Sequence, residues 1–299
     1  MPALVLVRYG ELALKSPPVR REFERTLTRN ILDQFAAAGT ECRIRSDHGH
    51  IYVESSEAEN SIRLLRRVFG VTSVSEVHET SSDRASIESA TLAWARPHLT
   101  SGCSFAIRAR RTGQHPFTSQ ELGRDLGGAV LGAWPELALK VDLTDPDVEI
   151  FVEVRGPRAY VSFDRAGGPG GLPLGVAGRV VALVDGSRGA LGAWLMMKRG
   201  CRCAIVSTES GRPHVEGVLW RFDPKHAPGA WVAGAEITST LARTAETWGA
   251  DGLVLPLGVD DYPAARAQWT DRVVFSPTVG LTDAEVEARW QHVVELASA

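Results

Sequence analysis

The fold of the last third of the chain is decided by residues 179–207, which read RVVALVDGSRGALGAWLMMKRGCRCAIVS. Two apolar runs, VVALV and CAIVS, flank a segment in which Leu191, Trp194 and Leu195 recur with helical spacing. Continuous apolar runs are typical of strands buried on both faces, as parallel strands are. Further runs follow in WVAGAE, DGLVLPLG and RVVFS. This alternation predicts a parallel sheet with a crevice at the carboxyl ends of its strands.

The turn between the first strand and its helix reads Val184-Asp185-Gly186-Ser187-Arg188-Gly189. Many α/β domains bind phosphate at such a turn, because the N–H groups at the helix N-terminus point towards the ligand. The composition here suits phosphate poorly, because Asp185 places a negative charge at the mouth of the turn. The turn therefore has the position of a phosphate-binding loop but not its usual composition. An alternative role for Asp185 is to cap the helix.

The first 78 residues follow the order βαββαβ, which is the ferredoxin-like plan. A strand at 3–7 precedes a helix predicted over Arg20–Ala38. This helix carries apolar residues four positions apart on one face: Phe23, Leu27, Ile31 and Phe35. Two strands, CRIRS and HIYVE, follow around the turn Asp47-His48-Gly49. A second helix and the strand VTSVSEV complete the predicted domain 1–78.

A second module is predicted over residues 79–166, with the element order α, β, α, β, β, β. Its last three strands are LKVDLT, VEIFVEV and AYVSF. Its strand CSFAIRARR is followed by a helix that Thr118 and Glu121 open with capping-box spacing. The stretch AGGPGGLPLG that comes next is typical of a hinge or a loop. We therefore place a linker at 167–178 and a carboxy-terminal domain at 179–299. The fold class is α/β and α+β.

The best candidate for nucleic-acid binding is the segment 105–128, FAIRARRTGQHPFTSQELGRDLGG. Basic side chains alternate along its strand and continue in a loop where hydroxyl and N–H donors can reach phosphates. The candidate RNA contacts are Arg108, Arg110, Arg111, His115 and Ser119, with Lys15 and Arg21 extending the surface. Arg21, Arg25 and Arg29 also form an i, i+4, i+8 stripe on the first predicted helix. The competing interpretation of both groups is a solvated charged surface.

Composition narrows the class of protein. A chain of 299 residues, 44% of them hydrophobic, accommodates two or three domains. Its net charge of -3 does not indicate a basic protein, so RNA would have to bind a local patch. The four cysteines form no CxxC pair, and we expect no metal site. No apolar run approaches ~18 residues, so we expect a cytoplasmic protein that does not enter the membrane.

Several stretches together resemble the tRNA 4-thiouridine synthetase family, also called tRNA sulfurtransferase. They are RYGELALKSPPVRREFERTLTRNI at 8–31, the segment 105–128, VDLTDPDVEIFVEV at 141–154, and GGLPLG with WLMMKRGC within 170–201. The resemblance implies a ferredoxin-like domain, a THUMP domain that binds the acceptor end of tRNA, and a Rossmann-like adenine-nucleotide alpha-hydrolase domain. Enzymes of this family adenylate a uridine of tRNA with ATP and Mg²⁺, and a cysteine persulfide then supplies sulfur.

Two departures from the family determine the functional hypothesis. The family's pyrophosphate loop, SGGxDS, aligns with Val184–Gly189, where only Gly186 matches, so we interpret this turn as a degenerate nucleotide loop. The family also keeps a reactive cysteine late in the chain, whereas no cysteine follows Cys203 and the sequence stops at Ala299 without a rhodanese-like extension. We therefore predict a tRNA-binding pseudoenzyme and assign no catalytic residue. ATP and Mg²⁺ are expected only if the degenerate loop functions.

Two alternatives stay open at this point. The first is an active ATP-dependent tRNA sulfurtransferase, in which Arg188 contacts the phosphates directly and a sulfur-donor protein acts in trans. The second is an interaction module that pairs with a catalytic relative or forms a homodimer.

Overall fold

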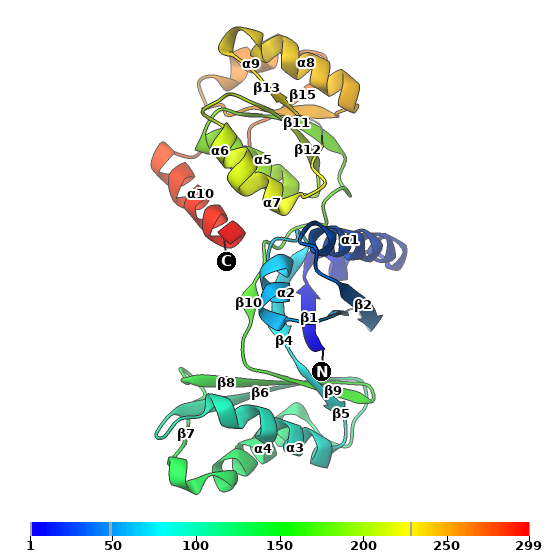
Figure 1. Cartoon of the computed structure of the whole chain (residues 1–299), viewed down its shortest axis with the longest axis vertical. Helices are drawn as coiled ribbons and strands as arrows, with labels where there is room; N and C mark the ends of the chain where they lie inside the picture. Colours follow the sequence, from blue (N-terminus) through cyan, green and yellow to red (C-terminus); the bar gives the residue numbers. More distant parts are fainter. Residues whose placement is uncertain (1, 48–49, 228, 299) are drawn as a thin grey trace. The chain divides into compact units, whose positions relative to one another are not determined.

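The computed structural model describes residues 2–47, 50–227 and 229–298, and the chain folds into two compact units (Figure 1). Unit 1 comprises Met1–Leu6, Tyr52–Ala58 and Ser75–Ala166, and unit 2 comprises Val7–Ile51, Glu59–Val74 and Gly167–Ala299. The turn predicted at His48 and Gly49 lies outside the described residues.

The first sheet has the strand order β4-β1-β3-β2, with the short strand β10 added beside β4. Its elements are β1 (Ala3–Tyr9), α1 (Pro17–Ala37), β2 (Cys42–Asp47), β3 (His50–Ser55), α2 (Ala58–Leu65), β4 (Val71–Glu76) and β10 (Ala166–Gly167). The predicted ferredoxin-like plan is thereby confirmed. Helix α1 begins at Pro17, three residues before the predicted start, because proline suits the first turn of a helix.

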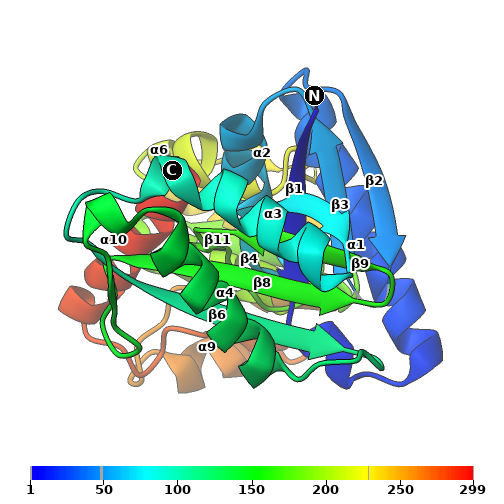
Figure 2. The same cartoon turned by 90° about the horizontal axis from the view of Figure 1, so that it is seen from below.

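A second sheet lies wholly in unit 1, in the order β5-β9-β8-β6-β7. Figure 2 shows helices α3 and α4 lying over its strands. The elements are β5 (His78–Ser81), α3 (Arg84–Ala95), β6 (Ser104–Thr112), α4 (Ser119–Ala133), β7 (Lys140–Val141), β8 (Val148–Arg155) and β9 (Arg158–Ser162). Phe105, Leu122 and Ile150 are buried between the helices and the sheet. The predicted capping box is confirmed, since Thr118 Oγ1 accepts the N–H of Glu121 and the Glu121 carboxylate accepts the N–H of Thr118.

Strand β7 is much shorter than the six-residue run LKVDLT predicts. Asp142 Oδ1 accepts the backbone N–H groups of Thr144 and Asp145, at 2.8 and 3.1 Å. A side chain that bonds to its own backbone two residues on forms a turn in place of a strand. Consequently β7 pairs only with Ser104 and Phe105 at the start of β6.

The third sheet lies in unit 2 and is parallel throughout, in the order β13-β12-β11-β14-β15. Its elements are β11 (Arg179–Val184), α5 (Ser187–Lys198), β12 (Arg202–Ser207), α6 (Arg212–His214), the π-helical turn Val215–Leu219, α7 (Trp220–Phe222), β13 (Ala230–Trp231), α8 (Ile237–Trp248), β14 (Gly252–Val254), α9 (Tyr262–Gln268), β15 (Val273–Phe275) and α10 (Asp283–Ser298). The predicted parallel sheet is confirmed.

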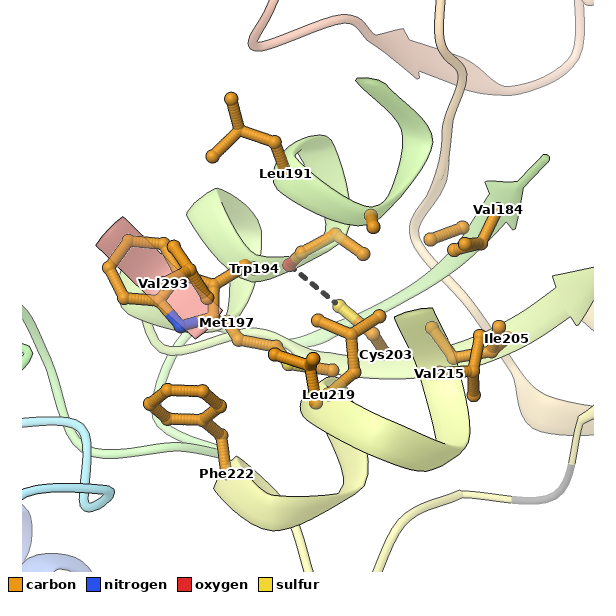
Figure 3. Close-up of a cluster of buried hydrophobic side chains, with 14 of the residues drawn as sticks. Val184, Leu191, Trp194, Met197, Cys203, Ile205, Val215, Leu219, Phe222 and Val293 are labelled. Carbon is orange, nitrogen blue, oxygen red and sulfur yellow. Dashed lines mark hydrogen bonds between the residues drawn. The ribbon is translucent and has the colours of Figure 1, made fainter. Parts of the chain in front are cut away.

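Both faces of this sheet are covered, which explains the continuous apolar runs. Helices α5, α7 and α10 cover one face, and α8 and α9 cover the other. Figure 3 shows the first of these cores, where Trp194 and Met197 of α5 meet Leu219 and Cys203. The Cys203 thiol lies 3.7 Å from the Ala193 carbonyl oxygen, and burial raises its pKa well above the usual value. Cys203 is therefore a packing residue.

Within unit 2, residues from the first seventy positions pack against the carboxy-terminal sheet. The ring of Phe69 lies 5.5 Å from the rings of both Trp194 and Phe222 and is 1% exposed. Two buried amides of α1 also bond to this region: Asn30 Nδ2 donates to the Leu174 carbonyl and Gln34 Nε2 to the Arg221 carbonyl. These contacts join the two segments through apolar packing and satisfied polar groups.

The stretch predicted as a linker bonds to the turn after α5. Leu172 N–H donates to the Lys198 carbonyl at 2.9 Å, and Gly175 N–H donates to the Gly200 carbonyl at 2.8 Å. At Gly171, with φ of +75°, an added Cβ would lie 2.1 Å from the Lys198 oxygen. Only glycine allows the backbone to approach this closely.

We predict that Phe69→Ala lowers the free energy of unfolding by about 3–5 kcal/mol, because it leaves a cavity between Trp194 and Phe222. Urea unfolding followed by tryptophan fluorescence would measure this change. Leu32→Ala is the matched control, since Leu32 is 45% exposed. Equal stability of the two variants would contradict the assigned role of Phe69.

Candidate nucleic-acid groove and nucleotide loop

A groove of about 850 Å³ in unit 1 runs between β6, α4 and the segment 141–143. Its lining contains three of the predicted RNA contacts, Arg108, Arg110 and Ser119. Strand β6 and helix α4, which residues 113–118 connect, thus form two walls of the groove.

Two local features leave space for the groove. In the described chain no strand pairs with the outer edge of β6 from Ala106 onwards, because β7 ends at Val141. The wall of α4 also carries glycines, and an added Cβ at Gly127 or Gly128 would meet nothing within 4 Å. The N–H and C=O groups along the open strand edge are therefore available to a ligand.

The three arginines of the groove differ in their partners. Arg108 Nε bonds to Glu149 Oε1 at 2.6 Å and Nη2 bonds to the Leu143 carbonyl at 3.0 Å. Arg110 and Arg124 are exposed and make no hydrogen bond or ion pair with the described part of the chain. Arg110 and Arg124 thus have no bonded carboxylate among the described residues, although the pKa of the nearby Glu121, lowered mainly by its capping-box hydrogen bonds, is also lowered by the charge of Arg124.

The other predicted RNA contacts lie outside the groove lining. Arg111 Nη1 donates to the Gly113 carbonyl at 2.9 Å, and His115 Nε2 lies 3.1 Å from the Thr112 carbonyl. Arg111 therefore bonds to the loop between β6 and α4, and His115 bonds to the last residue of β6. Lys15 and Arg21 are exposed residues of unit 2 and stay predictions as RNA contacts.

The sequence interpretation missed the helical wall and the apolar floor of the groove. The wall residues recur every three or four positions, which is the spacing of one helix face: Gln120, Gly123, Arg124, Gly127, Gly128 and Leu131. This spacing in the sequence could have indicated that these residues share one face of a helix. Leu131, Val141 and Leu143 are 39%, 51% and 65% exposed, so apolar surface surrounds the charges.

The degenerate nucleotide loop lies at the carboxyl end of β11, where the strand order changes direction between β12 and β14. Helix α5 begins at Ser187, and its N-cap is Gly186, with no hydrogen bond from a capping side chain. The prediction that Asp185 caps the helix is therefore wrong. Burial raises the pKa of the Asp185 carboxyl.

The loop is bonded to the segment that follows β12. Ser207 Oγ and the Thr208 N–H both donate to the Val184 carbonyl, and Ser210 Oγ donates to the Asp185 carbonyl. At Gly211 an added Cβ would lie 2.0 Å from the Val184 oxygen. The loop backbone is thus held by protein contacts on this side.

Arg188 is turned to the segment after β15. Its Nη1 donates to the Thr278 carbonyl and its Nη2 donates to the Leu281 carbonyl and to Asp283 Oδ1, all at 2.8 Å. The Arg188 side chain is only 20% exposed. Both terminal nitrogens of Arg188 thus donate hydrogen bonds to protein oxygens. An active sulfurtransferase in which Arg188 contacts the phosphates would require these nitrogens to bond to ATP.

No group of three or more His, Cys, Asp or Glu side chains that could hold a metal occurs among residues 2–47, 50–227 and 229–298. Among the described helices, none is long and apolar enough to cross a membrane.

Two family models match the chain. The ThiI ferredoxin-like domain matches residues 4–75, and the THUMP domain matches residues 82–164. The probable tRNA sulfurtransferase of Methanothermobacter thermautotrophicus is 38% identical over 213 residues, which cover 69% of this chain and 53% of that protein. The chain spans about half the length of the curated relatives it matches.

Two crystal structures match nearly the whole chain. The protein PH1313 of Pyrococcus horikoshii has a TM-score of 0.82 and 25% identity, covering 97% of this chain and 99% of its own. A 4-thiouridine synthetase, crystallised with RNA and bound ATP, has a TM-score of 0.78 and 22% identity, covering 99% and 86%. At this identity, the similarity to the 4-thiouridine synthetase shows a shared fold.

We predict that Gly189→Ser, which restores the final serine of SGGxDS, destabilises the protein by about 1–3 kcal/mol. An added Cβ at Gly189 would lie 2.4 Å from the Leu183 oxygen and 3.2 Å from Asp185 Oδ1. Gly127→Ser on α4 is the control, because that position is open. Urea denaturation of both variants checks the prediction, and a Gly189→Ser protein as stable as the control would refute it.

Proposed function

This chain belongs to the tRNA sulfurtransferase family, and from that premise we propose that it binds tRNA in the groove of unit 1 and does not activate it with ATP. The observation that carries the proposal is the combination of an apolar floor with two exposed arginines, Arg110 and Arg124, that form no ion pair with the described residues. Nucleobases pack with their faces against apolar and aromatic surfaces, and guanidinium groups donate hydrogen bonds to phosphate oxygens.

The groove is suited to unpaired nucleotides. Leu131, Val141 and Leu143 offer exposed apolar contact for bases that are free to leave a stack. The open edge of β6 adds N–H donors that can bond to phosphate or ribose oxygens. A single-stranded end fits this arrangement better than a duplex, which supports the acceptor end of tRNA as the ligand.

Three features of the nucleotide loop support the absence of adenylation. The Asp185 carboxyl opposes a bound diphosphate, and Arg188 is engaged by Thr278, Leu281 and Asp283. The crowded position at Gly189 leaves no room for the hydroxyl-bearing residue of the family's loop. The residues present therefore do not fit a diphosphate and its magnesium.

We predict that replacing Arg110 and Arg124 together with alanine weakens tRNA binding and reduces its salt dependence. The slope of log K against log salt should fall by ~0.7 for each lost contact to single-stranded phosphate. Filter binding at several salt concentrations measures the slope. Arg289→Ala is the control, since Arg289 is an exposed residue of α10 in the other unit. An unchanged slope in the double variant would remove the groove as the RNA site.

Calorimetric titration of Mg²⁺-ATP, with and without saturating tRNA, tests the second half of the proposal. We expect no detectable heat of ATP binding in either condition, because the loop offers no seat for the diphosphate. Binding near the micromolar range, or ATP consumption that depends on tRNA, would instead support an active tRNA sulfurtransferase supplied with sulfur by another protein.

A further inference from the structure

Unit 2 contains a cavity of about 530 Å³, lined in part by charged side chains, at the amino ends of the parallel strands. Arg179 is the first residue of β11 and Arg202 is the first residue of β12, and both line the cavity together with Arg29 of α1. The degenerate nucleotide loop lies at the opposite, carboxyl end of β11. The cavity is therefore separate from the strand-end crevice in which doubly wound sheets bind their ligands.

The walls of the cavity are held by specific contacts. Leu174 is fixed by the hydrogen bond from Asn30 Nδ2 to its carbonyl at 3.1 Å. Gly178 has a φ of +92°, and an added Cβ there would lie 2.5 Å from Asp251 Oδ2. The same carboxylate oxygen accepts the backbone N–H of Arg179 at 3.0 Å. The start of β11 is thus held in place beside α1 without a ligand.

Four cations line the cavity, and two of them are paired with carboxylates. Arg202 Nη1 bonds to Asp223 Oδ1 at 3.1 Å. Lys225 Nζ bonds to Asp33 Oδ1 at 2.6 Å. These two pairs leave little net charge of their own, so the other two cations determine what the cavity attracts.

Arg29 and Arg179 have no carboxylate bonded to their side chains among the described residues. The Arg29 guanidinium meets only Thr26 Oγ1, at 3.4 Å. The Arg179 guanidinium donates to the Trp248 carbonyl at 3.1 Å and lies 4.9 Å from the centre of the Trp248 ring. Each guanidinium therefore keeps N–H donors in fork geometry for an anion.

The arginine stripe of α1 leads to this cavity. Arg21, Arg25 and Arg29 are exposed and four residues apart, so they lie in one row along the helix. Like charges at this spacing repel each other in the free protein. An anion bound along the row would remove that repulsion.

We propose that the cavity between α1 and the amino ends of β11 and β12 binds phosphate groups through Arg29 and Arg179. Paired guanidinium groups match the geometry of phosphate oxygens, and the stripe of α1 extends the site for a ligand with several phosphates. Such phosphates belong either to an RNA backbone or to a free polyphosphate. The inference does not depend on tRNA binding by the groove of unit 1.

Calorimetric titration with inorganic tripolyphosphate tests the site directly. We expect the Arg29→Ala, Arg179→Ala double variant to bind tripolyphosphate roughly tenfold more weakly than the unmodified protein, because charge-assisted hydrogen bonds are lost. Arg289→Ala is the control and should bind normally. Arg29→Ala alone is a second test that leaves the fold undisturbed, since its side chain meets only Thr26.

The salt dependence of RNA binding by the same variants identifies the source of the phosphates. A slope that falls by ~0.7 to 0.9 per lost contact supports the site and assigns it to RNA. Loss of tripolyphosphate binding at an unchanged slope supports the site and assigns it to a free polyphosphate. Unchanged RNA slope and tripolyphosphate affinity in the folded double variant would overturn the proposal.

The variant with Arg110 and Arg124 replaced separates this inference from the proposed function. It should keep full affinity for tripolyphosphate, because neither residue lines the cavity of unit 2. If that variant retains all its RNA binding while the Arg29 and Arg179 variant loses it, the groove of unit 1 fails and the cavity of unit 2 stands.

Discussion

The packing of Phe69 against Trp194 and Phe222 is the contact on which the arrangement of unit 2 depends. It joins a residue from the first quarter of the chain to helices α5 and α7 of the carboxy-terminal sheet. Burial of one aromatic side chain contributes several kcal/mol, and the amides of Asn30 and Gln34 fix the orientation of α1 beside it. The same region of unit 2 contains the α1 wall of the cavity that Arg29 and Arg179 line, and the close approach of the Gly171 backbone to Lys198.

The fold was predictable where local sequence and tertiary packing favour the same structure. The parallel strands bury both faces, so their apolar runs are continuous, and the capping box at Thr118 is complete within four residues. Prediction was wrong where a side chain competes with the backbone, as Asp142 does at the end of β7. The position of Phe69 was not predictable, because its partners lie more than a hundred residues away and no periodicity links them.

The candidate site was predictable where it depends on local sequence, and not where it depends on distant partners. Alternation along β6 indicated Arg108 and Arg110, and the structure brings both into one groove with Ser119. Arg108 is nevertheless neutralised by Glu149, a residue 41 positions later that becomes its neighbour only when β6 and β8 pair. Arg188 likewise meets oxygens 90 to 95 positions downstream. Such partners determine whether an arginine is available, and single-sequence patterns do not contain them.

The uncovered edge of β6 has a consequence for self-association. An unpaired strand edge is a template on which a strand of another molecule can add, and this is a common route to aggregation. On this edge, however, Arg108, Arg110 and Arg111 lie within four residues of one another. Arg108 is paired with Glu149, but two copies that paired edge to edge would bring the charges of Arg110 and Arg111 together. The charge of Arg110 and Arg111 therefore disfavours edge-to-edge pairing of two copies, so the edge can stay open without a covering strand.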